Sequence, residues 1–212
     1  MRMLNDEDNK VIESAIKKAE ATTSGEIVFT AARASARYLH ATLQGAIIGM
    51  AIVTAVFLML PVTHNITSLL WTEFISFAAF YTLLPYLPWR RWIISKQEMD
   101  ARVNDAAFMQ FYASGLHRTR ESNGVEIYLS LFERRVVVIG DRGIHEKMGD
   151  RHWQNVRDLI IEGIRKGDLR GGVCAALESC GKALAENFPR RSDDVNELSN
   201  KVIERPLHEE AP

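Results

Sequence analysis

Cysteine is scarce in this sequence: its 212 residues include only 2. Cys174 and Cys180 lie six positions apart in a segment with helical periodicity. On one helix their side chains point away from each other, so no disulfide joins them there. The sequence therefore excludes a fold built on disulfides, and two unpaired thiols suit a reducing cytoplasm.

Net charge is also nearly absent, since 26 Lys and Arg residues balance 27 Asp and Glu residues. This balance gives no global attraction to nucleic acid, and we expect no nucleic-acid partner. Several catalytic patterns are missing as well. The chain has no H-E-x-x-H zinc motif, no phosphate-binding P-loop, no dinucleotide-binding glycine pattern and no recognisable Ser-His-Asp or Cys-His spacing. These absences argue against the common zinc, nucleotide-binding and nucleophilic enzymes.

Charged residues of either sign are missing from one long stretch, residues 42–88, except for Glu73. Two apolar runs fill this stretch, at 42–62 and 66–87, and each is long enough to cross roughly 30 Å of hydrocarbon as a helix. Two buried helices of a soluble core are the alternative, but core helices rarely run this long with so little polar surface. The sequence therefore predicts a transmembrane hairpin, with the lipid bilayer as one partner and other membrane proteins as further partners.

Basic residues flank both ends of the predicted hairpin, whereas the short segment between the spans has none. Those before the first span and after the second are Arg33, Arg37, Arg90, Arg91, Lys96 and Arg102. Because cytoplasmic segments next to a span carry the excess of Lys and Arg, both termini are expected in the cytoplasm, with two spans in the inner membrane. The acidic and polar residues 1–10 do not resemble a secretory signal.

Glu73 is the unusual residue of the hairpin, because a carboxylate within a span is costly unless it is protonated, paired or close to the interface. It lies about two turns from the outer end of its span, so one interpretation is that its side chain reaches toward that surface. The other interpretation is a proton or ion path within an oligomer of hairpins.

The rest of the chain has enough residues for one domain, which the hairpin interrupts. We expect its first part at residues 1–41 and its second part at 89–188, followed by a mostly disordered tail at 189–212. Periodicity predicts helices and strands in both parts. In chain order these are a helix from residue 6 capped by Asn5 or Asp6, a strand at 26–32, a helix at 95–116, strands at 125–131 and 135–139, and helices at 151–166 and 171–187. An even number of spans returns the chain to the same side of the membrane, so the strand before the hairpin can pair with those after it.

This order of elements resembles the TPM domain family, named after a thylakoid-lumen protein, a photosystem II repair protein and a modulator of nicotinic receptors. The residues that carry the resemblance are Thr23-Ser24-Gly25-Glu26-Ile27-Val28, Asn123-Gly124-Val125, the strand that leads to Gly143-Ile144, and Gly167-Asp168 before Gly172. The resemblance implies an α/β/α sandwich with a small central sheet between helices. It also implies either acid phosphatase activity with a divalent cation or an assembly, repair or receptor-modulating role without an assigned reaction.

Polar residues gather after the strand at 135–139, which we expect to be central and buried on both faces. They are Asp141, His145, Glu146, Asp150 and His152. Loops at strand ends are where α/β sheets usually bind ligands, although a solvated polar loop is the alternative. If a hard cation such as Ca²⁺ or Mg²⁺ binds, Asp141 and Asp150 are the expected ligands, with Glu133 as a third, and Arg142 is the candidate for holding an anion.

Two functions follow from these observations. The first is a membrane protein whose cytoplasmic TPM-like domain acts without catalysis, as an interaction or assembly and quality-control module. The alternative is a divalent-cation-dependent phosphatase acting on phosphomonoesters. The turn between the two later strands reads Leu131-Phe132-Glu133, without the adjacent acidic pair expected from the family, and this favours the first function.

Overall fold

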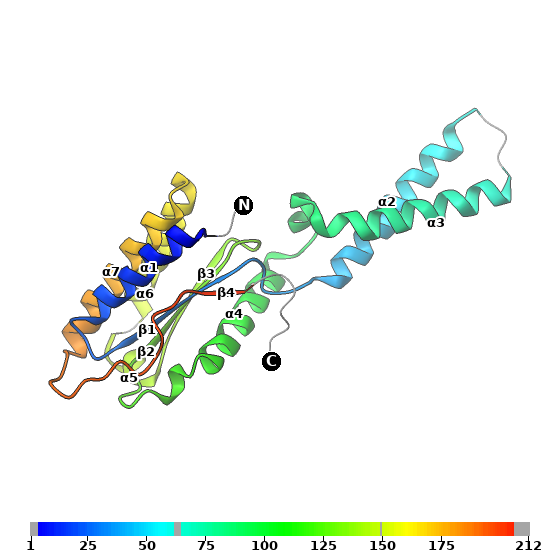
Figure 1. The fold of residues 1–212 in the computed structure, drawn as a ribbon. Coiled ribbons are helices and arrows are strands. Elements are labelled where there is room, and N and C mark those ends of the chain that lie inside the picture. The colour runs from blue at the N-terminus through cyan, green and yellow to red at the C-terminus, as the bar shows by residue number, and fades with distance from the viewer. Residues whose placement is uncertain (1–3, 62–64, 149, 206–212) are drawn as a thin grey trace. The chain divides into compact units, whose positions relative to one another are not determined.

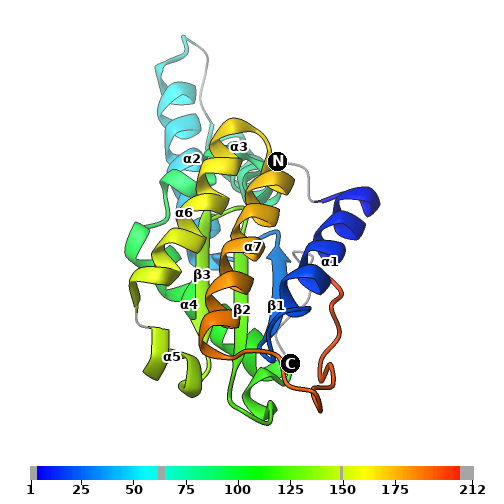
Figure 2. The ribbon, with the colours of Figure 1, turned by 90° about the vertical axis from the view of Figure 1, so that its left-hand side faces the viewer.

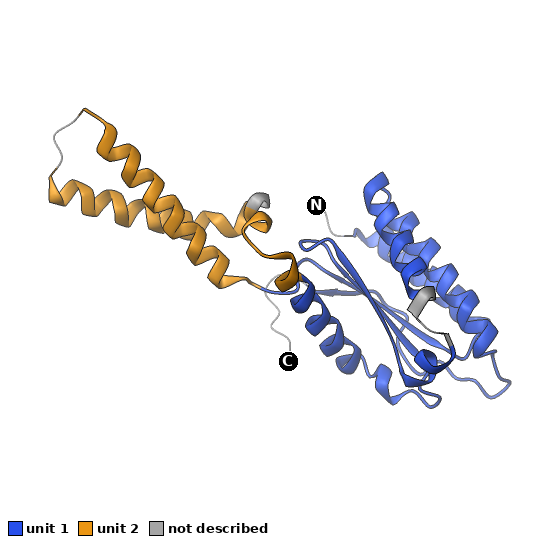
Figure 3. Cartoon of the chain, turned by 180° about the vertical axis from the view of Figure 1, so that it is seen from behind, with its two compact units in different colours: residues 1–36, 100–212 blue, residues 37–99 orange. Residues whose placement is uncertain are grey.

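The computed structural model describes residues 4–61, 65–148 and 150–205. The chain divides into two compact units (Figure 3). One contains residues 1–36 and 100–212, and the other contains residues 37–99. The second unit is thus an insertion in the chain of the first.

The first unit holds a small sheet with helices (Figure 1). Its elements are α1 (Asp6–Glu20), β1 (Glu26–Ala32), the 3-10 helix η3 (Leu116–Arg118), β2 (Gly124–Ser130), β3 (Arg135–Gly140), α5 (Arg142–Met148), α6 (Asp150–Lys166), α7 (Leu169–Asn187) and β4 (Ile203–Arg205). The second unit holds α2 (Leu39–Met59), α3 (Ile66–Leu83) and the 3-10 helices η1 (Leu84–Tyr86) and η2 (Pro88–Trp92). Helix α4 (Lys96–Ala113) begins in the second unit and continues in the first.

The sheet is mixed, with strand order β3-β2-β1-β4. Strand β1 pairs in parallel with β2 along its whole length, from Glu26 opposite Gly124 to Ala32 opposite Ser130. Strand β3 is antiparallel to β2, and β4 is parallel to β1. The chain therefore forms an α/β sandwich with a four-stranded sheet, which confirms the predicted fold class.

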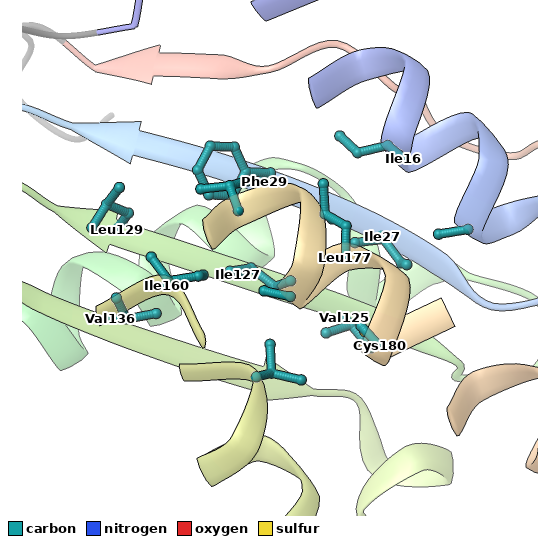
Figure 4. Close-up of a cluster of buried hydrophobic side chains, with 14 of the residues drawn as sticks. Ile16, Ile27, Phe29, Val125, Ile127, Leu129, Val136, Ile160, Leu177 and Cys180 are labelled. Carbon is teal, nitrogen blue, oxygen red and sulfur yellow. The ribbon is translucent and has the colours of Figure 1, made fainter. Parts of the chain in front are cut away.

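Helices cover both faces of the sheet. On one face α1, α6 and α7 lie side by side (Figure 2) and bury the main apolar core. Figure 4 shows that core, to which β2 contributes Val125, Ile127 and Leu129. On the other face α4 packs Val103 and Ala107 against Tyr128. Alternation along β2 thus follows the pleat of a strand that is covered on both sides.

Three residues singled out in the sequence, Asn5, Asp168 and Gly172, have local structural roles. Asn5 caps α1 as expected, because its side chain accepts a hydrogen bond from Asp8 N at 2.7 Å. Asp168 caps α7 in the same way, accepting from Gly171 N at 2.8 Å. Gly172 allows α7 to approach α6 closely, since a Cβ there would lie 2.8 Å from the Cα of Gly163.

Two expectations are wrong, one about the position of β3 and one about the tail. Strand β3 is an edge strand and not a central one, and within it only Val136 is buried. The tail is ordered as far as residue 205, because Ile203–Arg205 pairs with β1 as β4. Residues 206–212 lie outside the described residues.

In the inserted unit, α2 and α3 pack against each other through small residues. A Cβ on Gly49 would meet the ring of Phe80 at 2.6 Å, so the glycine lets the ring approach the α2 backbone. Both helices are long and apolar enough to cross a membrane. In the most apolar stretch of each, only 22% is buried in the first helix and 6% in the second. The exposed side chains include Ile47, Ile48, Ile52, Val56, Ile66, Leu70, Phe74 and Ile75.

Glu126 is fully buried on the α4 face of β2, where a carboxylate is not expected. Neither of its oxygens has a hydrogen-bond partner among the described residues. Burial raises the pKa of Glu126 from 4.5 to about 8, although the nearby Thr30 hydroxyl and the Arg205 guanidinium act against the rise. At neutral pH the side chain is therefore mostly protonated and neutral, which is the form that burial favours.

We expect this proton to make the stability of the domain depend on pH. The folded state keeps the proton up to about pH 8, whereas the unfolded state releases it near 4.5, so stability falls as pH rises between these values. Glu126→Gln should remove this dependence, which amounts to about 1.4 kcal/mol of the free energy of unfolding per pH unit. Urea unfolding in detergent, followed by the fluorescence of Trp153 with Trp71, Trp89 and Trp92 replaced by Phe, measures it. Equal slopes for the two proteins would contradict this account of Glu126.

Candidate functional site

The starts of β1 and β2 lie side by side because the two strands are parallel. Asn123, just before β2, joins the two strand entries. Its side-chain Nδ2 donates to the backbone carbonyl oxygen of Ser24 at 2.6 Å, and its backbone carbonyl oxygen accepts from Glu26 N at 3.3 Å. Asn123 is buried, and its Oδ1 has no partner in the part of the chain that the structure describes.

The segment after α7 runs across this end of the sheet, where β1 and β2 begin. Ser24 N donates to the carbonyl oxygen of Phe188 at 3.0 Å, and Glu197 N donates to Glu26 Oε1 at 2.9 Å. Further along, the Asn200 side chain donates to Glu20 Oε2. Residues at the end of α1, at the start of β1 and in the tail are thus brought together.

Two pockets flank this crossing, and Asp194 lines both of them. The first has a volume of about 170 Å³ and is rich in ion pairs. Arg191 contacts Glu121 at 2.8 Å and Asp193 at 3.2 Å. Arg120 contacts the same Asp193 at 3.6 Å. Both arginines of this first pocket therefore contact acidic side chains.

The second pocket has a volume of about 240 Å³ and lies at the start of β1. We call it the β1 pocket, and it is lined by Lys17, Glu20, Ala21, Thr23, Gly25, Glu26, Arg190, Asp194, Asn196 and Asn200. Glu26 is only 6% exposed, and its Oε2 has no hydrogen-bond partner within the described ranges. Glu20 accepts hydrogen bonds from Ile27 N, at 2.8 Å, and from Asn200.

The pKa values of the two glutamates reflect this crowding. Burial raises the pKa of Glu20 to about 7, and the charges of Glu26 and Asp194 add to the rise. Burial also raises the pKa of Glu26, with further contributions from Glu197 and Asp194. Hydrogen bonds from backbone N–H groups act in the opposite direction at both residues. The β1 pocket is therefore rich in acceptors, and near neutral pH its three acidic side chains roughly balance Lys17 and Arg190, because Glu20 is then about half protonated.

Comparison with known proteins finds a family similarity and a similar fold. The family model of the TPM domain matches residues 92–183, which run from η2 into α7. This stretch of the chain is similar to the TPM domain. Among solved structures, the NMR structure of BA42 protein from the psychrophilic bacterium Bizionia argentinensis is similar, with a TM-score of 0.60 and 24% identity over 96% of each chain. At this identity the likeness shows the fold alone. The search of curated proteins gives no match.

Two of the predicted site residues, Glu133 and Asp141, lie at opposite ends of β3. Asp141 follows β3 and accepts a hydrogen bond from Arg142 N at 2.7 Å, at the start of α5. Glu133 precedes β3, is 1% exposed, and accepts from Ser35 N at 3.0 Å. The six-residue strand between them spans about 20 Å. The expectation that Glu133 and Asp141 share one ion is therefore wrong, because each oxygen that binds an ion must lie within about 2.6 Å of that ion.

The other predicted residues are more scattered. Arg142 is well exposed and contacts Glu146 at 2.9 Å, one turn along α5. The side chain of Asp150 lies outside the described residues. Across the described ranges, no three His, Cys, Asp or Glu side chains are grouped closely enough to hold a metal ion. Metal binding by Asp141 and Asp150 and anion binding by Arg142 stay predictions.

Glu73 lies in α3 and is half-buried. Its backbone carbonyl oxygen accepts a hydrogen bond from the Ser76 hydroxyl at 3.1 Å. Its two interpretations, a side chain that reaches the membrane surface and a proton path, both stay predictions.

Sequence reasoning missed Glu20 and Glu26 as site residues. Glu26 belongs to the motif that carries the family resemblance, but it served there only as a marker of the strand. An available signal was a charged residue opening a strand that is otherwise apolar. Glu20 and Asn200 gave no such signal, because their proximity depends on where the tail runs.

We expect Glu26→Gln to lower the pKa of Glu20, because it removes one of the negative charges that raise it. The pKa should fall below about 7 yet stay above 4.5, since burial is the largest cause and remains. Titration of the glutamate side-chain carboxyl carbons by NMR measures this change. Glu162→Gln on α6 is the matched control and should leave the pKa of Glu20 where it was. An unchanged pKa in Glu26→Gln would show that the two carboxylates do not interact.

Proposed function

We propose that the chain is an integral membrane protein with two spans and cytoplasmic termini. Its TPM domain is a non-enzymatic interaction module that supports assembly or quality control of other membrane proteins in the inner membrane. The α2–α3 hairpin anchors the domain, and the domain binds the partner.

The observation that carries the proposal is the apolar surface of the hairpin. Large aliphatic and aromatic side chains are exposed along both helices, including Ile48 at 55%, Ile52 at 59% and Phe74 at 66%. Monomeric soluble proteins rarely expose contiguous apolar surface of this extent, whereas lipid tails would cover it. Backbone polar groups within each helix are satisfied internally, as the bilayer core requires.

Charge next to the hairpin supports the orientation. Arg33 and Arg37 precede α2, and Arg90 and Arg91 follow α3, whereas residues 61–65 contain no Lys or Arg. Both flanks of the hairpin thus favour the cytoplasmic side.

The scattered positions of the predicted catalytic residues support a binding role. The phosphatase alternative requires carboxylates gathered about a cation next to a phosphate-binding Arg. Glu133 and Asp141 lie at opposite ends of β3, and Arg142 is engaged with Glu146. The TPM domain does have a recess lined by charged groups, the β1 pocket, and this recess suits recognition of a partner.

Labelling of single cysteines tests the orientation. In a background of Cys174→Ser, with Cys180 fully buried, Asn65→Cys should react with a membrane-impermeant maleimide applied to intact cells. Asp158→Cys on α6 should react only after the cells are permeabilised, because the proposal puts the domain in the cytoplasm. Labelling of Asp158→Cys in intact cells would contradict the topology, and recovery of the chain in the soluble fraction would contradict the anchor.

A further inference from the structure

Three carboxylates beside the start of β1 have no cation partner among the described residues. They accept hydrogen bonds only from neutral groups. Glu20 accepts from Ile27 N and the Asn200 side chain, Glu26 from the backbone N–H of Glu197, and Glu197 from the backbone N–H of Arg120. The neighbouring Arg190 and Arg191 contact Asp194 and Glu121 instead. A positive ligand would therefore meet carboxylates that no cation has yet neutralised.

A second observation indicates that such a ligand binds. Glu26 is more than nine-tenths buried and lines the β1 pocket, yet its Oε2 is without a partner in the described part of the chain. A buried carboxylate oxygen that is left unpaired is destabilising, so proteins normally supply it with a donor. The pocket beside it is open and large enough to admit that donor from outside.

We propose that the β1 pocket binds a primary ammonium group, the side chain of a lysine on the partner protein. This inference rests on the proposed function, since it names the chemistry by which the TPM domain recognises its partner. The ammonium group donates to Glu26 Oε2 and lies beside the carboxylate of Glu20.

Geometry favours an ammonium group over a metal ion. A metal needs several ligand oxygens within about 2.6 Å of one point, and no three acidic or other metal-binding side chains in the described ranges are grouped in that way. An ammonium group instead donates up to three hydrogen bonds to acceptors about 2.8 Å away, so more widely spread oxygens satisfy it.

The same geometry favours lysine over arginine. A guanidinium group binds best to a carboxylate with both oxygens free, through two parallel hydrogen bonds. Glu26 offers only Oε2, because Oε1 already accepts from Glu197 N, and both oxygens of Glu20 are occupied as well. A compact ammonium group needs only single acceptors.

Binding should depend on pH through Glu20. The charged groups around it are Glu26 on β1, Lys17 on α1, and Asp194 and Arg190 in the tail. A cation binds best when Glu20 is ionised, and its pKa of about 7 leaves it mostly protonated at pH 6. The affinity should therefore be up to about tenfold higher at pH 8 than at pH 6.

NMR titration of the full chain in detergent micelles tests the inference. The probe is the amide of Nα-acetyl-lysine, and the reporters are the side-chain NH₂ of Asn200 and the backbone N–H groups of Ile27 and Glu197, which donate to the two glutamates. These signals should shift with the probe at pH 8, should not shift with the amide of Nα,Nε-diacetyl-lysine, and should lose their response in Glu26→Gln.

Matched variants separate the alternatives. Glu162→Gln, whose carboxylate contacts Lys166 on the outside of α6, should bind the probe like the wild type. Lys17→Met should bind equally or more tightly, and a large loss of stability there would instead show that the protein's own lysine fills the β1 pocket. An equal response to the arginine analogue, a response to Ca²⁺ or Mg²⁺ alone, or no response to any probe would overturn the inference.

The inference and the proposed function fail in different ways. Partner capture from the membrane that persists in Glu26→Gln would overturn lysine recognition and leave the anchored interaction module standing. A soluble location of the chain would overturn the anchor without affecting the titration.

Discussion

Parallel pairing of β1 with β2 is the constraint on which the rest of the structure depends. The two strands are joined by residues 33–123, which contain the entire apolar hairpin, so the sheet forms only if both ends of that insertion return to the same place. A parallel pair needs a long crossover in any case, and residues 33–123 supply it. The same pairing puts the starts of β1 and β2 at one edge of the sheet. The tail then crosses that edge, and both pockets follow from it.

The domain accommodates two buried glutamates in different ways. Glu126 faces α4 in the middle of the sheet and lines neither pocket. Its carboxyl group stays protonated at neutral pH, which avoids the cost of burying a charge. Glu26 opens β1 at the rim and lines a pocket, where its Oε1 has a backbone donor and its Oε2 has no partner among the described residues. The first glutamate therefore affects stability, whereas the second offers an acceptor to a ligand. Position within the same sheet decides which of the two outcomes applies.

Most of the fold was predictable because its signals are local. The cap at Asn5, the alternation along β2 and the length of the two apolar helices each depend on residues close together in sequence. Strand β3 was misplaced because a run of β-branched residues indicates a buried strand without saying whether another strand lies beyond it. Strand β4 has three residues and no periodicity, and only its pairing with β1 defines it. The β1 pocket combines α1, β1 and residues 190–200, a combination that no spacing in the sequence could indicate.

Amide hydrogen exchange of the full chain reconstituted in lipid nanodiscs tests most directly that the sheet closes across the inserted unit of residues 37–99. Amides in the middle of β1, from Ile27 to Ala31, should exchange as slowly as those of their neighbours in β2, from Val125 to Leu129, because one cooperative sheet protects both. Slow exchange confined to β2 and β3, with β1 exchanging like an open segment, would contradict the account. It would mean that β1 does not pair with β2 across the inserted unit, and that the β1 pocket does not form.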